Sequence, residues 1–201
     1  MNTPTTPSNG PRMDRRQFVA GLMQHLPDTL VVTGLGSAAY DVFAAGDRPL
    51  NYYLWGAMGG AAAIGLGLAL AQPQRSVAVI TGDGELLMGI GTLATIGAKQ
   101  PANLSIVVLD NGHYGETGMQ RSHTSLGTNL VDVARGFGLP NAHATHDLKD
   151  CEAIAARIRA CSSPYLVQAL IEASEPPRVL PPRDGPYIKN RFRAALGLAP
   201  F

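Results

Sequence analysis

The architecture of the chain follows from residues 76–118, SVAVITGDGELLMGIGTLATIGAKQPANLSIVVLDNGHYGETG. Residues 76–81 are almost entirely β-branched or apolar, and such an unbroken run is typical of a buried strand. This run ends in Gly82-Asp83-Gly84, where a carboxylate stands between two residues that can adopt any φ. A second apolar run, residues 104–109, ends in Asp110-Asn111-Gly112. Each predicted strand is therefore followed at once by side chains that carry oxygen.

The segment between the two runs predicts a helix. Residues 86–98 carry this helix, and Gln100-Pro101 ends it because proline cannot continue a helix. A strand, a helix and a second strand in this order form a right-handed crossover within one parallel sheet. Both loops then lie at the same edge of the sheet, so we expect Asp83 and Asn111 to meet.

Asp83 and Asn111 suit a hard cation. Mg2+ takes oxygen ligands and is often held by one or two protein groups together with substrate phosphates. Backbone N–H groups of Gly84 and Glu85, at the start of the next helix, would face phosphate oxygens. Asp-Gly and Asn-Gly are also common turns, and each dipeptide alone is more often only a turn. Here each leads away from a buried strand, and the pair at this spacing is more specific than either half.

With these residues the chain resembles the thiamine diphosphate enzymes, whose cofactor motif is Gly-Asp-Gly followed, after an interval of similar length, by Asn. The resemblance implies that the side chains of Asp83 and Asn111 and the backbone carbonyl of His113 bind Mg2+. Asp110 stands where the family more often has Asn, and we expect it near the metal but not bound to it. The cofactor-binding residues implied by the resemblance are Gly56, Met58, Gly82, Asp83, Gly84, Glu85, Asn111, His113 and Tyr114.

Residues 51–71, NYYLWGAMGGAAAIGLGLALA, form the most apolar segment. Hydropathy alone could indicate a membrane span, but the segment contains many glycines and leads directly into the first strand of the motif. A buried helix packed closely on the sheet explains the small residues better. By resemblance, Trp55-Gly56-Ala57-Met58-Gly59 carries the apolar residue that holds the cofactor in its bent shape. That residue is Met58, and an ordinary core methionine is the alternative.

Residues 115–127, GETGMQRSHTSLG, are polar and lack a helical or strand period. Loops of this kind often carry specificity. Arg121 could pair with a substrate carboxylate, and Gln120 or His123 could hydrogen-bond a carbonyl or a developing oxyanion. A solvated loop without a catalytic role is an equal alternative for each of these three candidates.

Composition excludes several classes of function. The chain has 201 residues, a net charge of +1 and 15% charged residues, so nucleic acid and anionic membranes are not expected partners. Cys151 and Cys161 fall in one predicted helix, about 15 Å apart at 1.5 Å per residue, and cannot form a disulfide with each other. Cysteines in a metal-binding pattern are absent, so we expect a reducing, cytoplasmic setting.

The expected fold is a doubly wound α/β domain with a six-stranded, mainly parallel sheet and helices on both faces. We expect a disordered tail at residues 1–12, the cofactor-binding domain at residues 13–174 and an arm at residues 175–201. The remaining predicted strands begin near Thr29, Asn51, Asn141 and Tyr165. The other predicted helices cover residues 14–26, residues from Asn129 to Phe137 and residues that follow Asp147.

The resemblance also implies what the chain lacks. In the family a glutamate from a separate pyrimidine-binding domain supports the cofactor, and the predicted diphosphate-binding domain leaves no room for it here. The chain therefore resembles free-standing β subunits, as in sulfopyruvate decarboxylases, and the C-terminal half of phosphonopyruvate decarboxylases. The implied function is nonoxidative decarboxylation of a small 2-oxo acid, aliphatic or aryl, to an aldehyde and CO2. The implied assembly contains a pyrimidine-binding α subunit that supplies the glutamate, in a heterotetramer or larger.

Three alternatives stay open at this point. An acetolactate synthase-like carboligase would share all these residues and differ in its acceptor pocket. An oxoacid oxidoreductase that works with ferredoxin would usually bring cysteines for an iron–sulfur cluster, which this sequence lacks. A non-enzymatic module that only keeps the fold would be expected to lose Asp83 or Asn111, and both are present.

Overall fold

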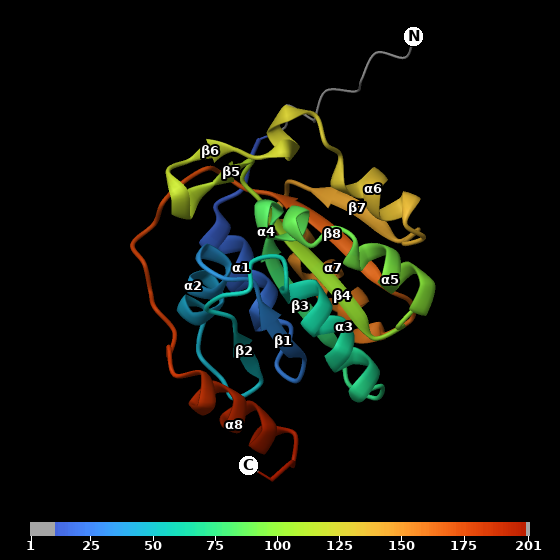
Figure 1. The fold of residues 1–201 in the computed structure, drawn as a ribbon. Coiled ribbons are helices and arrows are strands. Elements are labelled where there is room, and N and C mark those ends of the chain that lie inside the picture. The colour runs from blue at the N-terminus through green and yellow to red at the C-terminus, as the bar shows by residue number, and fades with distance from the viewer. Residues whose placement is uncertain (1–10, 200–201) are drawn as a thin grey trace.

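A computed structural model of the chain describes residues 11–199, so most of the predicted tail at residues 1–12 lies outside the described residues. The core is one sheet of six strands in the order β2-β1-β3-β4-β8-β7, and every neighbouring pair is parallel (Figure 1). This confirms the α/β class and the six strands predicted from the sequence. The strands are β1 (Leu30–Thr33), β2 (Asn51–Tyr53), β3 (Val77–Gly82), β4 (Leu104–Asp110), β7 (Ala142–Thr145) and β8 (Tyr165–Leu170).

Helices cover both faces of the sheet, because successive side chains of a buried strand point to opposite faces. In β3, Ala78 and Ile80 belong to one apolar core and Val79 belongs to the other. The first core is covered by α1 (Arg15–Gln24), α2 (Ser37–Ala44) and α7 (Cys151–Ala160). The second core is covered by α3 (Ala61–Ala71), α4 (Asp83–Met88), α5 (Thr92–Lys99) and α6 (Leu130–Gly136).

The topology creates a crevice at the carboxyl ends of the central strands. Strand β1 has β2 on one side and β3 on the other, so the order of the strands reverses there. Open parallel sheets bind ligands at such a switch point. Gly82 of β3 pairs with Leu109 of β4 in the register of the sheet. The loops that carry Asp83 and Asn111 therefore emerge side by side, as the sequence predicts.

Two predictions of local structure need correction. The single helix predicted for residues 86–98 is two helices, α4 and α5, with Gly89 between them. A Cβ atom built at Gly89 would lie 2.0 Å from the carbonyl oxygen of Gly59, so this break allows the backbone before α3 to approach closely. The loop of residues 115–127 is also not without structure. It contains β6 (Gln120–Arg121), which pairs with β5 (His113–Tyr114) just before the loop, and the 3-10 helices η1 (Gly115–Thr117) and η2 (His123–Leu126).

The apolar segment at residues 51–71 packs a helix on the sheet, as the sequence predicts, but this helix is not fully buried, since Ile64 and Leu70 are 37% and 51% exposed. It consists of the short strand β2 and the helix α3, whose Gly65 lies so close to Val79 that an added Cβ atom would be 2.2 Å from a Val79 methyl group. Small residues therefore let α3 pack against the sheet. Within residues 11–199, no helix is both long and apolar enough to cross a membrane.

The C-terminal segment runs back over the molecule after β8 and ends in the helix α8 (Gly185–Ala195), which lies beside β2 (Figure 1). Ile188 and Phe192 of this helix are 2% and 6% exposed. The rings of Phe192 and Tyr52 meet edge to face at 5.5 Å. Part of the predicted arm is thus packed on the domain. One further 3-10 turn, η3 (Leu148–Asp150), precedes α7.

Candidate functional site

A cleft opens at the carboxyl ends of the central strands, between the segments that follow β1, β3, β4 and β8. We call it the main cleft and define it by its lining residues, which include Arg15, Met58, Asp83, Asn111, Tyr114 and Glu116. All the cofactor-binding residues predicted from the sequence line this cleft except Gly56. The structure thus brings two distant parts of the sequence, the loop before α3 and the motif after β3, to one place.

The carboxylate of Asp83 is buried and held by two hydroxyl groups. Ser122 Oγ and Thr124 Oγ1 both donate to Asp83 Oδ2, the second over 3.1 Å. Burial raises the pKa of Asp83 to about 6, and the nearby charge of Asp110 adds to this increase. Thr124 Oγ1 also lies 2.9 Å from Asp110 Oδ1. Two carboxylates thus lie close together, and a cation beside Asp83 would favour its charged form.

Asp110 fixes the loop that follows β4. Its carboxylate accepts hydrogen bonds from Gly112 N over 2.8 Å and from Gln168 Nε2 over 2.5 Å, in addition to the contact with Thr124. Two N–H donors, from Gly112 and Gln168, point at its two different oxygens, and a carboxylate is an acceptor only. An asparagine would present an NH2 group to one of these donors. The local contacts therefore account for an aspartate at this position, and Asp110 does not line the main cleft.

Asn111 and His113 are held together by a tight turn. Asn111 Oδ1 accepts from His113 N over 2.9 Å, and His113 Nδ1 lies 2.8 Å from the carbonyl oxygen of Asn111. Gly112 between them has φ +71°, a conformation that favours glycine. Together with Asp83, the Asn111 amide and the His113 carbonyl offer an oxygen-only donor set of the kind that Mg2+ prefers. Within residues 11–199, no group of three or more His, Cys, Asp or Glu residues could hold a metal ion.

Glycine is required at only one of the two positions that flank Asp83. A Cβ atom built at Gly84 would lie 2.4 Å from Tyr114 Cε1, so the ring of Tyr114 packs directly on the backbone of α4. A Cβ atom at Gly82 would meet nothing within 4 Å. The first N–H groups of a helix have no partner within the helix, and α4 begins here without a side-chain cap. Gly84 and Glu85, whose N–H groups are among these, line the main cleft.

Glu85 does not direct its carboxylate into open space. Its Oε1 atom accepts from the backbone N–H groups of Gly59 over 2.9 Å and Ala61 over 3.1 Å, and Thr81 Oγ1 donates to Oε2. The carboxylate of Glu85 is therefore engaged within the chain, and a contact of the Glu85 backbone with a ligand stays a prediction. The carboxylate instead anchors the loop that carries Met58. Met58 lines the main cleft and is 39% exposed, so it is not an ordinary core methionine.

The three candidates from the polar loop lie elsewhere. Gln120, Arg121 and His123 are exposed and do not line the main cleft. Gln120 Nε2 donates to the carbonyl of Thr117 over 2.8 Å, and the guanidinium of Arg121 contacts Ser125. The structure of this chain does not bring these three side chains to the Asp83 region.

Sequence reasoning missed the residues of the same loop that do reach Asp83. Ser122 and Thr124 stand on either side of His123, and both are buried. Ser122 lies between β6 and η2 and Thr124 belongs to η2, so neither a strand period nor an α-helix period in the sequence marks them as inward-facing. Arg15 and Glu116 also line the main cleft. Arg15 lies far away in sequence, and no local pattern connects it with this site.

Comparison with known proteins gives independent information. The sequence profile described as "Thiamine pyrophosphate enzyme, C-terminal TPP binding domain" matches residues 34–169. Sulfopyruvate decarboxylase subunit beta of Methanocaldococcus jannaschii is 42% identical over 123 residues, which cover 61% of this chain and 64% of that subunit. Phosphonopyruvate decarboxylase of Streptomyces viridochromogenes is 39% identical over 181 residues, which cover 89% of this chain and 45% of that enzyme. The chain therefore spans only part of the length of these relatives.

Two weaker likenesses extend this comparison. Acetolactate synthase 2, chloroplastic, of Nicotiana tabacum is 27% identical over 194 residues, which cover 82% of this chain and 28% of that protein. Among solved structures, the thiamine diphosphate-dependent 4-hydroxybenzoylformate decarboxylase of Rhodococcus jostii RHA1 superposes with a TM-score of 0.68 at 22% identity. The match covers 88% of this chain and 36% of that one, and at this identity it shows the fold alone.

Proposed function

The chain belongs to the family of thiamine pyrophosphate enzymes through their C-terminal TPP-binding domain, and from this premise we propose that it is the diphosphate-binding β subunit of a 2-oxo acid decarboxylase. The enzyme depends on thiamine diphosphate and Mg2+, and it converts a small 2-oxo acid into an aldehyde and CO2. One observation carries this proposal. Asp83 and Asn111 emerge from adjacent strands and line the same cleft, at the switch point of the sheet.

The metal would be held by oxygen atoms of three residues. The side chains of Asp83 and Asn111 and the backbone carbonyl of His113 bind Mg2+ in this proposal. Ser122 and Thr124 donate to one carboxylate oxygen of Asp83, so they fix the orientation of the carboxylate that would bind the metal. The turn that joins Asn111 Oδ1 to His113 N restricts the second and third ligands in the same way. The site is thus preorganised by hydrogen bonds within the chain.

The organic part of the cofactor would lie over Met58 and against the start of α4. Thiamine diphosphate, when bound, supplies the electron sink that decarboxylation of a 2-oxo acid requires. The backbone N–H groups of Gly84 and Glu85 bind its diphosphate, where the helix dipole also favours negative charge. Leu35, Leu109 and Ile171 line the same cleft and limit the access of water to the reacting groups.

A partner subunit would supply the missing glutamate. Two glutamates line the main cleft among residues 11–199, and both are engaged. Glu85 binds the loop before α3, and Glu116 Oε2 lies 3.2 Å from Arg178 Nη2. The relative from M. jannaschii is named a subunit beta, which also supports an α partner. In the proposed assembly, pyrimidine-binding subunits and copies of this chain form a heterotetramer or a larger complex.

A carboligase subunit is the second candidate, because the chain is also similar to an acetolactate synthase. The two reactions would use the same cofactor-binding residues, and they differ in the compound that accepts the fragment left after CO2 is lost. Analysis of products separates them: a decarboxylase releases a free aldehyde, whereas a carboligase joins the two-carbon or larger fragment to a second oxo compound.

The experiment that tests the proposed function is reconstitution. The chain is purified alone and together with a candidate pyrimidine-binding subunit, and CO2 release is measured for a panel of aliphatic, aryl and doubly acidic 2-oxo acids. We expect turnover only in the mixture, with thiamine diphosphate and Mg2+ present. Turnover of a 2-oxo acid by the chain alone at the rate of the mixture would refute the dependence on a partner. The absence of CO2 release from the whole panel would refute the decarboxylase assignment.

A further inference from the structure

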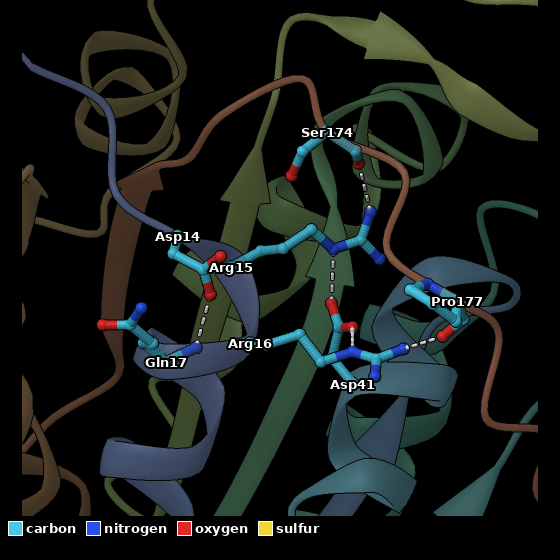
Figure 2. Close-up of polar contacts among 7 residues, drawn as sticks. All are labelled: Asp14, Arg15, Arg16, Gln17, Asp41, Ser174 and Pro177. Carbon is cyan, nitrogen blue, oxygen red and sulfur yellow. Dashed lines mark hydrogen bonds and ion pairs between the residues drawn. The ribbon is translucent and has the colours of Figure 1, made fainter.

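One buried carboxylate joins two arginines close to the main cleft. Asp41 of α2 lies between Arg15 and Arg16, the first two residues of α1 (Figure 2). Arg15 Nε is 2.7 Å from Asp41 Oδ2, and Arg16 Nε is 2.9 Å from Asp41 Oδ1. The side chain of Asp41 is 0% exposed. A single carboxylate balances a single guanidinium, so this cluster keeps one positive charge.

The two arginines differ in burial and in what they face. The side chain of Arg15 is 5% exposed and that of Arg16 is 25% exposed. Arg15 lines the main cleft, whereas Arg16 does not. Both line a second cavity, which we call the side cavity, between Asn111 and residues 174–178. Arg15 therefore stands where the main cleft and the side cavity adjoin.

The donors of Arg15 are only partly used. Its Nε atom donates to Asp41, and its Nη1 atom donates to the carbonyl of Ser174 over 3.3 Å (Figure 2). Within residues 11–199, Nη2 of Arg15 has no hydrogen-bond partner. Asp41 and Ser174 thus fix the plane of the guanidinium, and they leave one edge of it for a ligand.

The surroundings of Arg15 add to the positive potential. A cation in the first turn of a helix opposes the helix dipole, and Arg15 is the first residue of α1. Glu116 also lines both cavities, but its carboxylate is paired with Arg178 at 3.2 Å. Glu175, the other glutamate at the side cavity, is exposed. Because Asp41 divides its single negative charge between Arg15 and Arg16, the unused donors of Arg15 can still take a further partner of opposite sign.

We propose that Arg15 binds an oxyanion of the ligand in the main cleft, with its guanidinium oriented by Asp41 and by the Ser174 carbonyl. The proposed reaction contains two oxyanions that Arg15 could bind, so the identity of the ligand rests on the proposed function. One is the diphosphate of the cofactor, and the other is an acidic group of the 2-oxo acid. A guanidinium presents paired N–H groups that match the geometry of carboxylate, sulfonate and phosphate oxygens.

Arg16 provides a matched control within the same cluster. It shares Asp41 with Arg15, and its Nη2 atom donates to the carbonyl of Pro177 over 2.6 Å (Figure 2). Arg16 thus makes the same kinds of structural contact as Arg15, but without access to the main cleft. Any effect that is only structural should appear in both variants, whereas loss of ligand binding should appear in one.

The experiment compares Arg15→Met with Arg16→Met in the reconstituted complex. Calorimetry measures the affinity for thiamine diphosphate with Mg2+, and steady-state kinetics measures KM and kcat for the 2-oxo acid. We expect Arg15→Met to weaken either the cofactor affinity or the substrate KM by about 10- to 100-fold, which corresponds to one charge-assisted contact. A change in cofactor affinity would identify the diphosphate as the bound oxyanion, and a change in KM would identify the acidic group of the 2-oxo acid. Arg16→Met should leave both quantities within about twofold of the wild type.

Two outcomes would overturn the proposal. One is a folded Arg15→Met variant with unchanged cofactor affinity and unchanged KM. The other is an Arg16→Met variant that loses as much as Arg15→Met, because the effect would then come from the contacts with Asp41 and residues 174–178.

A second measurement covers a failure of Arg15→Met to fold. In the wild-type chain, chloride is replaced by sulfate or by inorganic pyrophosphate at constant ionic strength, and the melting temperature is recorded. We expect a saturable increase that is weaker in Arg15→Lys, which keeps the charge but cannot reach Asp41, Ser174 and the cleft together. No increase with either anion, or an equal increase in Arg15→Lys, would overturn the proposal. This measurement needs no turnover, so it still tests Arg15 if the proposed function fails.

Discussion

Glu85 accepts hydrogen bonds from the backbone N–H groups of Gly59 and Ala61, and this ties the helix that begins with the cofactor motif to the loop that carries Met58. Removing the carboxylate would leave these N–H groups without a hydrogen-bond partner, which costs about 1–3 kcal/mol of folding free energy. We expect Glu85→Ala to lower the free energy of unfolding by roughly this amount and to weaken cofactor binding through Met58. Urea unfolding and calorimetry of the complex measure the two effects. A variant with unchanged stability would show that this connection contributes nothing.

The Asp83→Asn variant distinguishes an effect on cofactor binding from an effect on folding. Burial and the charge of Asp110 both disfavour a charged Asp83 in the metal-free protein. The neutral amide should therefore leave the metal-free fold at least as stable as the wild type, although cofactor binding with Mg2+ falls below detection. Thermal unfolding without metal tests the stability of the fold, and calorimetry with Mg2+ tests cofactor binding. Unchanged cofactor affinity would remove Asp83 from the proposed metal site.

The two glycines of the motif offer a matched pair. A methyl group at Gly84 would overlap the ring of Tyr114, whereas a methyl group at Gly82 would meet nothing within 4 Å. We expect Gly84→Ala to lower the free energy of unfolding by about 1–3 kcal/mol, as overpacking does, and Gly82→Ala to leave it nearly unchanged. Equal stability of the two variants in urea would contradict the close packing of Tyr114.

Cys151 gives a prediction about pH. Burial, with a smaller contribution from Asp150, raises the pKa of its thiol from 9.0 to about 11, so folding favours the protonated form. The stability that this preference contributes is complete below pH 9 and is lost as the pH rises through 11. In the native chain at pH 8, we expect Cys151 to react with a disulfide reagent only as fast as the protein unfolds. Rapid labelling of Cys151 without denaturant would contradict this, and a Cys161→Ser background isolates the signal.

Phe192 tests whether the C-terminal helix is part of the folded domain. Its ring is 6% exposed and packs on Tyr52, whereas Tyr187 of the same helix is 49% exposed. Phe192→Ala should cost about 3–5 kcal/mol in the free energy of unfolding, and Tyr187→Ala should cost much less. Similar midpoints for both variants in a denaturant titration would show that α8 is not stably docked.

The sheet could be predicted because its strands are continuous apolar runs that need burial on both faces. The position of the cleft followed in the same way, since Gly82-Asp83-Gly84 and Asn111 come directly after two such runs. The helix α2 escaped prediction because it is short and has no side-chain cap at Gly36. The roles of Arg15 and Asp41 depend on how α1 packs on α2, which is a tertiary relationship. Ser122 and Thr124 were missed because they lie at the start of the short 3-10 helix η2, which leaves no strand or α-helix period in the sequence.

The docking of α8 has a consequence for the outermost strand on its side of the sheet. Among the strands of residues 11–199, β2 pairs only with β1, so its other side carries backbone groups without a strand partner there. Such edges are templates for uncontrolled pairing between molecules. Arg191 of α8 donates to the carbonyl of Asn51 over 3.1 Å and pairs with Asp47 at 2.6 Å, so a bulky cation occupies this edge. The C-terminal helix thus covers part of this edge, and a covered edge with a cation on it disfavours strand pairing between molecules.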